Sequence, residues 1–121
     1  MAKDDYDVLA YEILLYYYAV LKRKIVFKDE TFHALISKAE IPDEYLTDIL
    51  RMLQNEGLLE GVRTVKAWGN EMILSSNLSD IRITAAGIRY LGENSRMKKI
   101  GETLSVVPGL ISSLINIVKP F

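Results

Sequence analysis

The chain has 121 residues, half of them apolar and about a quarter charged, which suits one globular domain and excludes a disordered chain. It contains no cysteine, so neither a disulfide framework nor a thiolate metal site can form. The formal net charge of −1 and the isoelectric point of about 5.8 count against a domain built mainly to grip nucleic acid, because such domains usually carry a basic excess. The first residues, Met-Ala-Lys-Asp-Asp, lack the order of a signal peptide, so we expect a cytoplasmic protein.

The first predicted helix covers residues 5–24 and is apolar on nearly every side. Such a helix must be covered on more than one side, by the body of the domain and by either the C-terminal segment or a second subunit. Its tyrosines could bury their rings while their hydroxyls stay at a wet edge, which favours an interface. We therefore predict self-association as a homodimer through this helix and the C-terminal helix. The candidate interface residues are Leu9, Ile13, Tyr16, Tyr17, Leu110, Leu114 and Ile115.

A second, short helix is predicted over residues 29–39, followed by a turn at residues 40 and 41. A third helix begins at Pro42, which suits the first helical position because it lacks a backbone N–H. Apolar residues then recur at i, i+3, i+4 and i+7; they are Leu46, Ile49, Leu50 and Leu53. Gly57 ends this helix, because glycine adopts the left-handed conformation at little cost. Two amphipathic helices joined by so short a turn indicate a helix-turn-helix.

A hairpin is predicted after the third helix. Residues 59–67 suit a strand, residues 68–71 a turn with glycine and asparagine at its centre, and residues 72–74 the returning strand. The polar residues 75–80 suit a loop, and residues 81–83 form a last short strand that closes a small antiparallel sheet. Thr84 is placed to cap a helix from Ala85 to Leu91, in which Gly87 would allow close approach to a neighbouring element.

The C-terminal segment carries two more predicted helices. Ser95 can cap a helix that begins at Arg96, and Pro108 with Gly109 marks a break before the apolar residues 110–118. This stretch is shorter than the roughly 20 residues that span a bilayer, so we predict no membrane span. The whole pattern predicts a mainly helical α+β fold: a winged helix with a small antiparallel sheet, a long N-terminal helix and an added C-terminal helical segment. We treat residues 1–121 as one domain, with a core of about 5–104 and an apolar extension over 105–121.

Three pieces of sequence occur together in one order. The first covers residues 41–62, from Ile-Pro-Asp-Glu-Tyr at the start of the third helix to Leu-Gln-Asn-Glu-Gly-Leu-Leu-Glu-Gly-Val at its end. Residues 83–91 read Ile-Thr-Ala-Ala-Gly-Ile-Arg-Tyr-Leu, and residues 93–99 read Glu-Asn-Ser-Arg-Met-Lys-Lys. Their order and spacing resemble the YjcQ-like family of small winged-helix proteins, found in bacteria and often within prophages. The likeness runs from about Asp29 to Leu104. It implies a winged-helix fold and, by analogy with winged helices in general, nucleic-acid binding, with a phage or prophage origin.

If the protein binds double-stranded DNA, the third helix should enter the major groove with its N-terminal residues nearest the bases. From Pro42 to Glu56 there are four acids and one base, and carboxylates at the leading edge are repelled by phosphates. The outward polar residues of the helix remain usable, and the hairpin adds basic residues and a tryptophan. The candidate DNA-binding residues are Thr47, Arg51, Gln54, Asn55, Arg63, Lys66 and Trp68. A second basic patch, or else ordinary solvated surface, is formed by Arg82, Arg89, Arg96, Lys98 and Lys99.

Two functions from different classes stay open. The first is a DNA-binding transcriptional regulator that acts as a dimer on two half-sites. The second is a winged helix that serves as a protein-interaction module without DNA binding, with the acidic third helix and Trp68 facing a protein partner. Catalysis has little support, since His33 is the only histidine and no triad order, phosphate-binding glycine loop or metal-ligand spacing occurs. We expect a protein that is not an enzyme and has no cofactor and no metal site.

Overall fold

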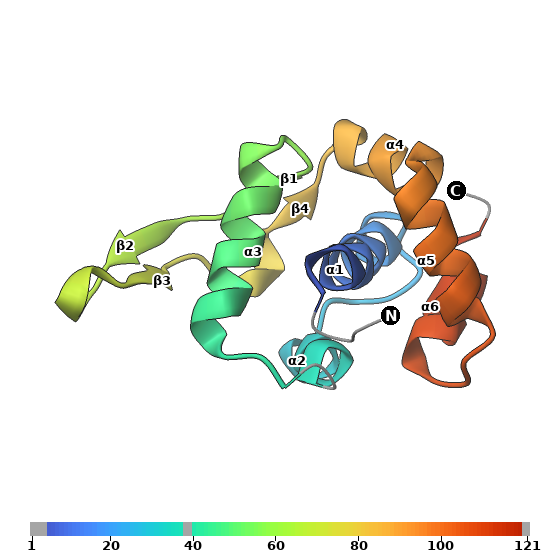
Figure 1. The fold of residues 1–121 in the computed structure, drawn as a ribbon, viewed down its shortest axis with the longest axis horizontal. Helices are drawn as coiled ribbons and strands as arrows, with labels where there is room; N and C mark the ends of the chain where they lie inside the picture. Colours follow the sequence, from blue (N-terminus) through green and yellow to red (C-terminus); the bar gives the residue numbers. More distant parts are fainter. Residues whose placement is uncertain (1–4, 38–39, 120–121) are drawn as a thin grey trace.

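The computed structural model describes residues 5–37 and 40–119, and its helices surround a central helix while one hairpin extends away from them (Figure 1). The helices are α1 (Tyr6–Leu21), α2 (Asp29–Ser37), α3 (Asp43–Asn55), α4 (Ala85–Glu93), α5 (Ser95–Ser105) and α6 (Leu110–Val118). The strands are β1 (Leu59–Glu60), β2 (Thr64–Lys66), β3 (Met72–Leu74) and β4 (Arg82–Ile83). The predicted mainly helical α+β class is confirmed, and α2, α3 and the hairpin follow one another in a winged-helix-like layout. Residues 38 and 39, predicted as the end of the second helix, lie outside the described residues.

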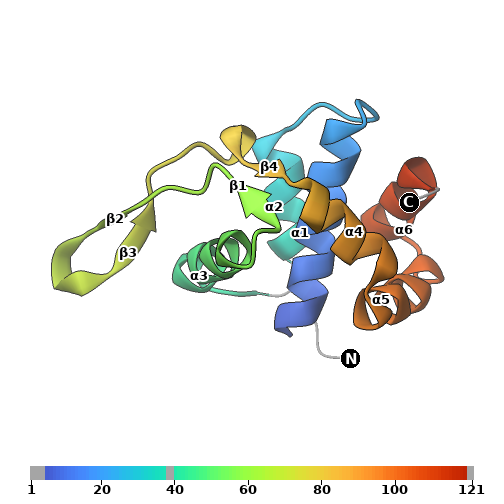
Figure 2. The ribbon, with the colours of Figure 1, turned by 90° about the horizontal axis from the view of Figure 1, so that it is seen from above.

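The helix α1 is the centre of the core. Figures 1 and 2 show α2 and α3 on one side of it and α4, α5 and α6 on the other. Most of its side chains are buried, and Leu9, Ile13 and Leu14 have no exposed surface. A helix that is apolar on nearly every side must be covered on several sides, and here the helices of the same chain supply that cover.

Two tyrosines of α1 are hydrogen-bonded inside the domain. The Tyr16 hydroxyl accepts a hydrogen bond from the Lys28 backbone N–H (3.1 Å) and donates one to the Lys28 carbonyl (3.3 Å). The Tyr17 hydroxyl donates to the Leu78 carbonyl at 2.8 Å, and burial raises the pKa of Tyr17 above its ordinary value. Buried hydroxyls need such partners, so these two hydroxyls lie inside the domain and not at a solvent-exposed edge. The prediction that they favour an interface is wrong.

The C-terminal helix α6 packs against α1 (Figure 2). Leu114, Ile115 and Val118 are almost completely buried, and the Lys22 ammonium at the end of α1 donates a hydrogen bond to the Val118 carbonyl (2.7 Å). Residues 110–118 are therefore part of the core rather than an extension of it. The predicted oligomer interface is wrong for the residues buried within the chain: Leu9, Ile13, Tyr16, Tyr17, Leu114 and Ile115. Leu110 is half-buried against the same core, and self-association itself stays a prediction.

The end of α3 follows the predicted glycine stop. The Gly57 N–H bonds to the Gln54 carbonyl and the Leu58 N–H to the Leu53 carbonyl, both at 2.9 Å. Gly57 itself has a φ of +79°, so the helix ends in a Schellman motif. This motif turns the chain out of α3 and into β1.

The helix α4 packs directly against the turn that follows α3. The Thr84 hydroxyl oxygen accepts a hydrogen bond from the Gly87 N–H at 3.0 Å, and the hydroxyl donates to the Gly57 carbonyl. Gly87 is buried, and a Cβ at this position would overlap the Leu58 carbonyl oxygen. The predicted cap at Thr84 and the close approach at Gly87 are both confirmed.

Residues 59–67 form two strands rather than the single predicted one. β1 pairs with β4 and β2 pairs with β3, each as a separate antiparallel two-stranded ladder, so the predicted single sheet is wrong. The break falls at Gly61, where φ is +86° and a Cβ would meet the Asp80 carbonyl oxygen at 2.7 Å. Glycine fits such a backbone position. The chain therefore bends at Gly61 and, after the buried Val62, enters the extended hairpin.

Two helix boundaries also differ from the predictions. Asn94 rather than Ser95 caps α5, since its side-chain oxygen accepts a hydrogen bond from the Met97 N–H at 3.1 Å. Both residue types are good caps, so the pattern alone does not choose between them. The helix α4 continues to Glu93, two residues beyond the predicted end at Leu91.

Among the described helices, none combines the length and the apolar character that crossing a membrane requires.

Candidate nucleic-acid interface

The hairpin of β2 and β3, residues 63–74, is called the wing below. It extends away from the helical body in both ribbon views (Figures 1 and 2). Trp68 at its tip is 97% exposed, and Arg63 and Lys66 are exposed as well. A hydrogen bond from the Ala67 N–H to the Glu71 carbonyl (2.7 Å) closes the tip. The three predicted wing residues therefore reach solvent from one extended element.

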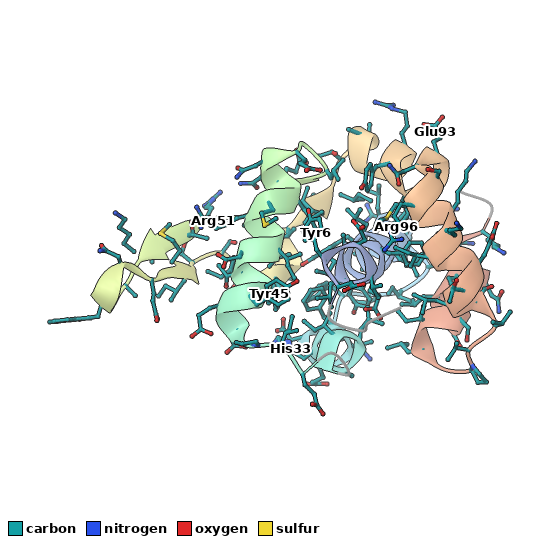
Figure 3. All side chains as sticks on the ribbon, viewed as in Figure 1. Tyr6, His33, Tyr45, Arg51, Glu93 and Arg96 are labelled. Carbon is teal, nitrogen blue, oxygen red and sulfur yellow. The ribbon has the colours of Figure 1, made fainter. Side chains whose placement is uncertain are left out.

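The helix α3 presents Arg51 and Asn55 to solvent beside the wing. Figure 3 shows Arg51 on the side of α3 toward the hairpin. Its guanidinium forms an ion pair of 3.7 Å with Asp48, and the two side chains are 40% and 57% exposed. Exposed pairs of this kind contribute little to stability, so Arg51 can exchange Asp48 for a phosphate. Asn55 is exposed one turn later.

Thr47 points into the domain. It is only 7% exposed, and its hydroxyl donates a hydrogen bond to the Asp43 carbonyl at 3.1 Å. Thr47 precedes Leu50 by three positions and therefore lies on the inward side of the helix. Bonding to the carbonyl one turn back satisfies its hydroxyl there. The prediction that Thr47 faces outward and contacts DNA is wrong.

The Gln54 side chain holds the base of the wing. Its amide nitrogen donates to the Val62 carbonyl (2.9 Å) and its amide oxygen accepts from the Val62 N–H (2.7 Å). These two bonds fix the residue just before Arg63. Gln54 is therefore a positioning residue, and the prediction that it is free to contact a base is wrong. Helical spacing contains no signal for these two bonds, because their partner, Val62, lies beyond the end of the helix.

We expect Gln54→Leu to loosen the wing. Leucine keeps most of the side-chain volume but leaves the Val62 N–H and C=O without partners, which should lower the free energy of unfolding by about 2 kcal/mol. Amide hydrogen exchange at Val62 should become faster. Asn55→Leu is the matched control, because Asn55 is the exposed neighbour and should change stability by less than about 0.5 kcal/mol. Unaltered exchange at Val62 in Gln54→Leu would show that this side chain does not hold the wing.

The exposed groups of the wing and α3 offer positive charge, amide hydrogen bonds and an aromatic surface. Burial is the main cause of a raised pKa at four tyrosines of the described chain, Tyr6, Tyr11, Tyr17 and Tyr90. A raised pKa keeps a tyrosine neutral. Within residues 5–37 and 40–119 no three His, Asp or Glu side chains are grouped so that they could hold a metal ion.

Comparison with protein families decides the relationship of this chain. The family model described as YjcQ protein matches residues 11–108. The chain belongs to the YjcQ family. The match confirms the predicted resemblance and is wider than residues 29–104, because it also takes in most of α1. The helix α6 lies beyond the matched residues. No curated protein and no solved structure matches the chain.

In this YjcQ-family domain the five residues of the second predicted basic patch do not share one surface, although Arg96, Lys98 and Lys99 line one hollow on α5. The Arg96 guanidinium pairs with Asp7 at 3.1 Å, near the first turn of α1. Arg82 lies on β4 and lines a small hollow with Leu21, the last residue of α1. The 16 residues of α1 separate its ends by about 24 Å at 1.5 Å per residue. The wing and the exposed side of α3 therefore remain as the candidate nucleic-acid interface.

Proposed function

We propose that this YjcQ-family protein binds double-stranded DNA through its wing and the adjoining C-terminal half of α3, and that it acts as a transcriptional regulator. The observation that carries the proposal is the extended hairpin that exposes Arg63, Lys66 and Trp68 together. The winged-helix-like order of α2, α3 and the wing supports it by analogy. Fold analogy alone does not assign a function, so the support has to come from the chemistry of the site.

The wing has the chemistry of an element that contacts a duplex. Arginine and lysine neutralise phosphates, and such contacts supply most of the affinity that does not depend on sequence. Arg63 lies at the base of the wing and Lys66 near its tip, so the two cations are spread along one edge of the hairpin. The indole of Trp68 is free to pack on a sugar or to enter a minor groove as an apolar wedge. The acidic Glu71 lies on the returning side of the tip.

The acids of α3 determine how the helix approaches DNA. Asp43, Glu44 and Asp48 make its N-terminal half acidic, while duplex DNA presents about one negative charge per 1.7 Å of its axis. Entry of the N-terminal half, the usual helix-turn-helix geometry, would bring these carboxylates to the phosphates. If the wing leads instead, Arg51 and Asn55 approach the duplex beside it, while Asp43 and Glu44 face the hollow next to β3.

We expect Arg63→Glu to weaken binding to a short duplex roughly tenfold and to lower the slope of log affinity against log salt by about one or more. Arg51→Glu should act in the same direction. Lys99→Glu makes the same change in net charge on α5, which lies on the far side of the body from the wing (Figure 1). This control should leave the salt slope nearly unchanged. Fluorescence anisotropy with a labelled duplex at several salt concentrations measures both quantities.

Two results would count against this function. An equal loss of affinity in Arg63→Glu and Lys99→Glu would mean that only net charge matters. Unchanged affinity in both Arg63→Glu and Arg51→Glu would remove duplex binding through this surface altogether.

A further inference from the structure

A hollow with a volume of about 390 Å³ lies between the N-terminal half of α3 and the wing, and is called the α3–β3 groove below. Leu74 and Leu78 contribute apolar surface to it, while Asp43 and Glu44 of α3 supply carboxylates. Figure 3 shows His33 on α2, next to that end of α3, and its side chain completes the lining. A hollow of this volume is within the range of sites that bind ligands.

One wall of the groove is the unpaired edge of β3. Met72, Ile73 and Leu74 all line the groove. Side chains alternate between the two faces of a strand, so three consecutive residues can border one hollow only if the edge of the strand faces it. β3 pairs with β2 on its other side, and α3 packs against β3. The free edge of β3 therefore faces α3.

The pattern of the ladder shows which backbone groups lie on that edge. The Ser75 N–H bonds to the Arg63 carbonyl across the hairpin, and bonded and non-bonded positions alternate along an antiparallel ladder. Ile73 is consequently bonded to β2, whereas the N–H and C=O groups of Met72 and Leu74 point away from β2. Within the described part of the chain these groups have no hydrogen-bond partner. An unpaired edge of this kind is a template for another strand.

We infer that the α3–β3 groove binds an extended, basic segment of a protein partner, which adds as a strand to β3. Backbone hydrogen bonds to Met72 and Leu74 would hold the segment, and pockets for alternate side chains would give selectivity, as in other cases of strand addition. Apolar side chains of the segment would contact Ile73 and Leu74. Its lysines or arginines would meet Asp43 and Glu44. The same carboxylates repel acidic segments and phosphates, which is why the groove suits a basic protein segment.

This inference goes beyond duplex binding and does not depend on it. The cations of the wing point to DNA, whereas the groove combines carboxylates with a free strand edge. The acidic N-terminal half of α3 takes no part in the proposed DNA contact. The inference assigns it a partner, a basic protein segment. The two surfaces are tested with different probes, so either can fail alone.

The test uses three capped synthetic peptides with the full chain. One alternates valine and lysine, the second has glutamate in place of lysine, and the third is the lysine peptide with its strand-bonding amides N-methylated. The lysine peptide should bind, and each of the other two should bind at least about tenfold more weakly, because one loses charge complementarity and the other loses backbone hydrogen bonds. Amide chemical shifts should change at Met72, Leu74 and the N-terminal half of α3.

A matched pair of proline variants tests the strand edge. Met72→Pro removes an N–H on the groove edge, while Lys66→Pro removes one on the opposite edge of the same hairpin, since the two residues are cross-strand partners. Proline on a strand edge leaves the ladder bonds in place. Met72→Pro should lower the affinity for the lysine peptide about fivefold or more through the lost hydrogen bond, and Lys66→Pro should not lower it. Asp43→Asn combined with Glu44→Gln should lower the affinity for the lysine peptide by a similar factor. Glu60→Gln is the control and should leave this affinity unchanged.

Several results would overturn the inference. These are no binding of the lysine peptide, equal binding of all three peptides, or equal losses in the two proline variants. If Met72→Pro fails to fold, the N-methylated peptide still decides the question with the unaltered chain. Self-association that is lost in Met72→Pro, without peptide binding, would assign the edge to a second copy of this chain. Duplex DNA that shifts the Met72 and Leu74 amides would assign the groove to nucleic acid.

Discussion

Replacing Ile115 with alanine should lower the free energy of unfolding by about 3 kcal/mol, whereas the same replacement at Ile117 should lower it by less than about 1 kcal/mol. Both residues lie on α6, but Ile115 is 1% exposed and Ile117 is 40% exposed. Ile115 fills space against the core, and its removal leaves a cavity that the surrounding helices close only in part. Chemical denaturation followed by circular dichroism measures both values.

The same pair of variants separates a core helix from an interface helix. If Ile115 served as a contact between two copies, Ile115→Ala would change the molar mass measured by light scattering and would hardly affect the unfolding of a monomer. That outcome would contradict the position of α6 in the core. Truncation after Val107 is the extreme case. It removes Leu114, Ile115 and Val118 together and should abolish cooperative unfolding, because α1 then loses the cover on one side.

Gly87→Ala should lower the free energy of unfolding by about 2 kcal/mol or more, although alanine is the better helix former. A Cβ at position 87 would overlap the Leu58 carbonyl oxygen and the Ile83 side chain, so either α4 or the turn after α3 has to move. That turn leads into the wing, and the substitution should therefore also weaken duplex binding. Chemical denaturation and anisotropy measure the two effects.

The control for Gly87 is a glycine that needs its conformation but has space around it. Gly57 has a φ of +79° and no heavy atom within 4 Å of a built Cβ among the described residues. Gly57→Ala should cost about 1 kcal/mol through backbone strain alone. A cost for Gly87→Ala that is no larger would show that α4 is not seated on the turn after α3.

Much of the fold could be predicted from local patterns. Helical spacing located α1 and α3 to within a few residues, because apolar side chains on one side of a helix must meet the core. Gly57 and Thr84 were recognisable because their roles depend on neighbours in the chain. The division of residues 59–67 into two strands at Gly61 could not be recognised in this way, because it depends on the approach of Asp80, which is distant in the sequence.

The candidate site was predictable only in part, for a related reason. Arg63, Lys66 and Trp68 lie in a short hairpin with a polar tip, and that local pattern places them outside. Gln54 was misassigned because its hydrogen-bond partner, Val62, lies beyond the end of the helix. Thr47 was misassigned although its spacing from Leu50 places it on the inward side of the helix, where its hydroxyl bonds to the Asp43 carbonyl.

The cover of α1 could not be assigned for the same reason. The apolar pattern of α1 shows that the helix must be covered on several sides. It does not tell whether the cover comes from the same chain or from a second copy. The structure assigns it to α6 and the other helices of the chain.

The most direct test of wing-led DNA binding is a titration of ¹⁵N-labelled protein with a short duplex at low salt, followed through the amide chemical shifts. Binding through the wing predicts that the changes concentrate at residues 63–70 and at Arg51 and Asn55. The amides of Asp43, Glu44 and α5 should stay where they are. Changes that cluster on the N-terminal half of α3, or that spread over α4 to α6 without the wing, would contradict it.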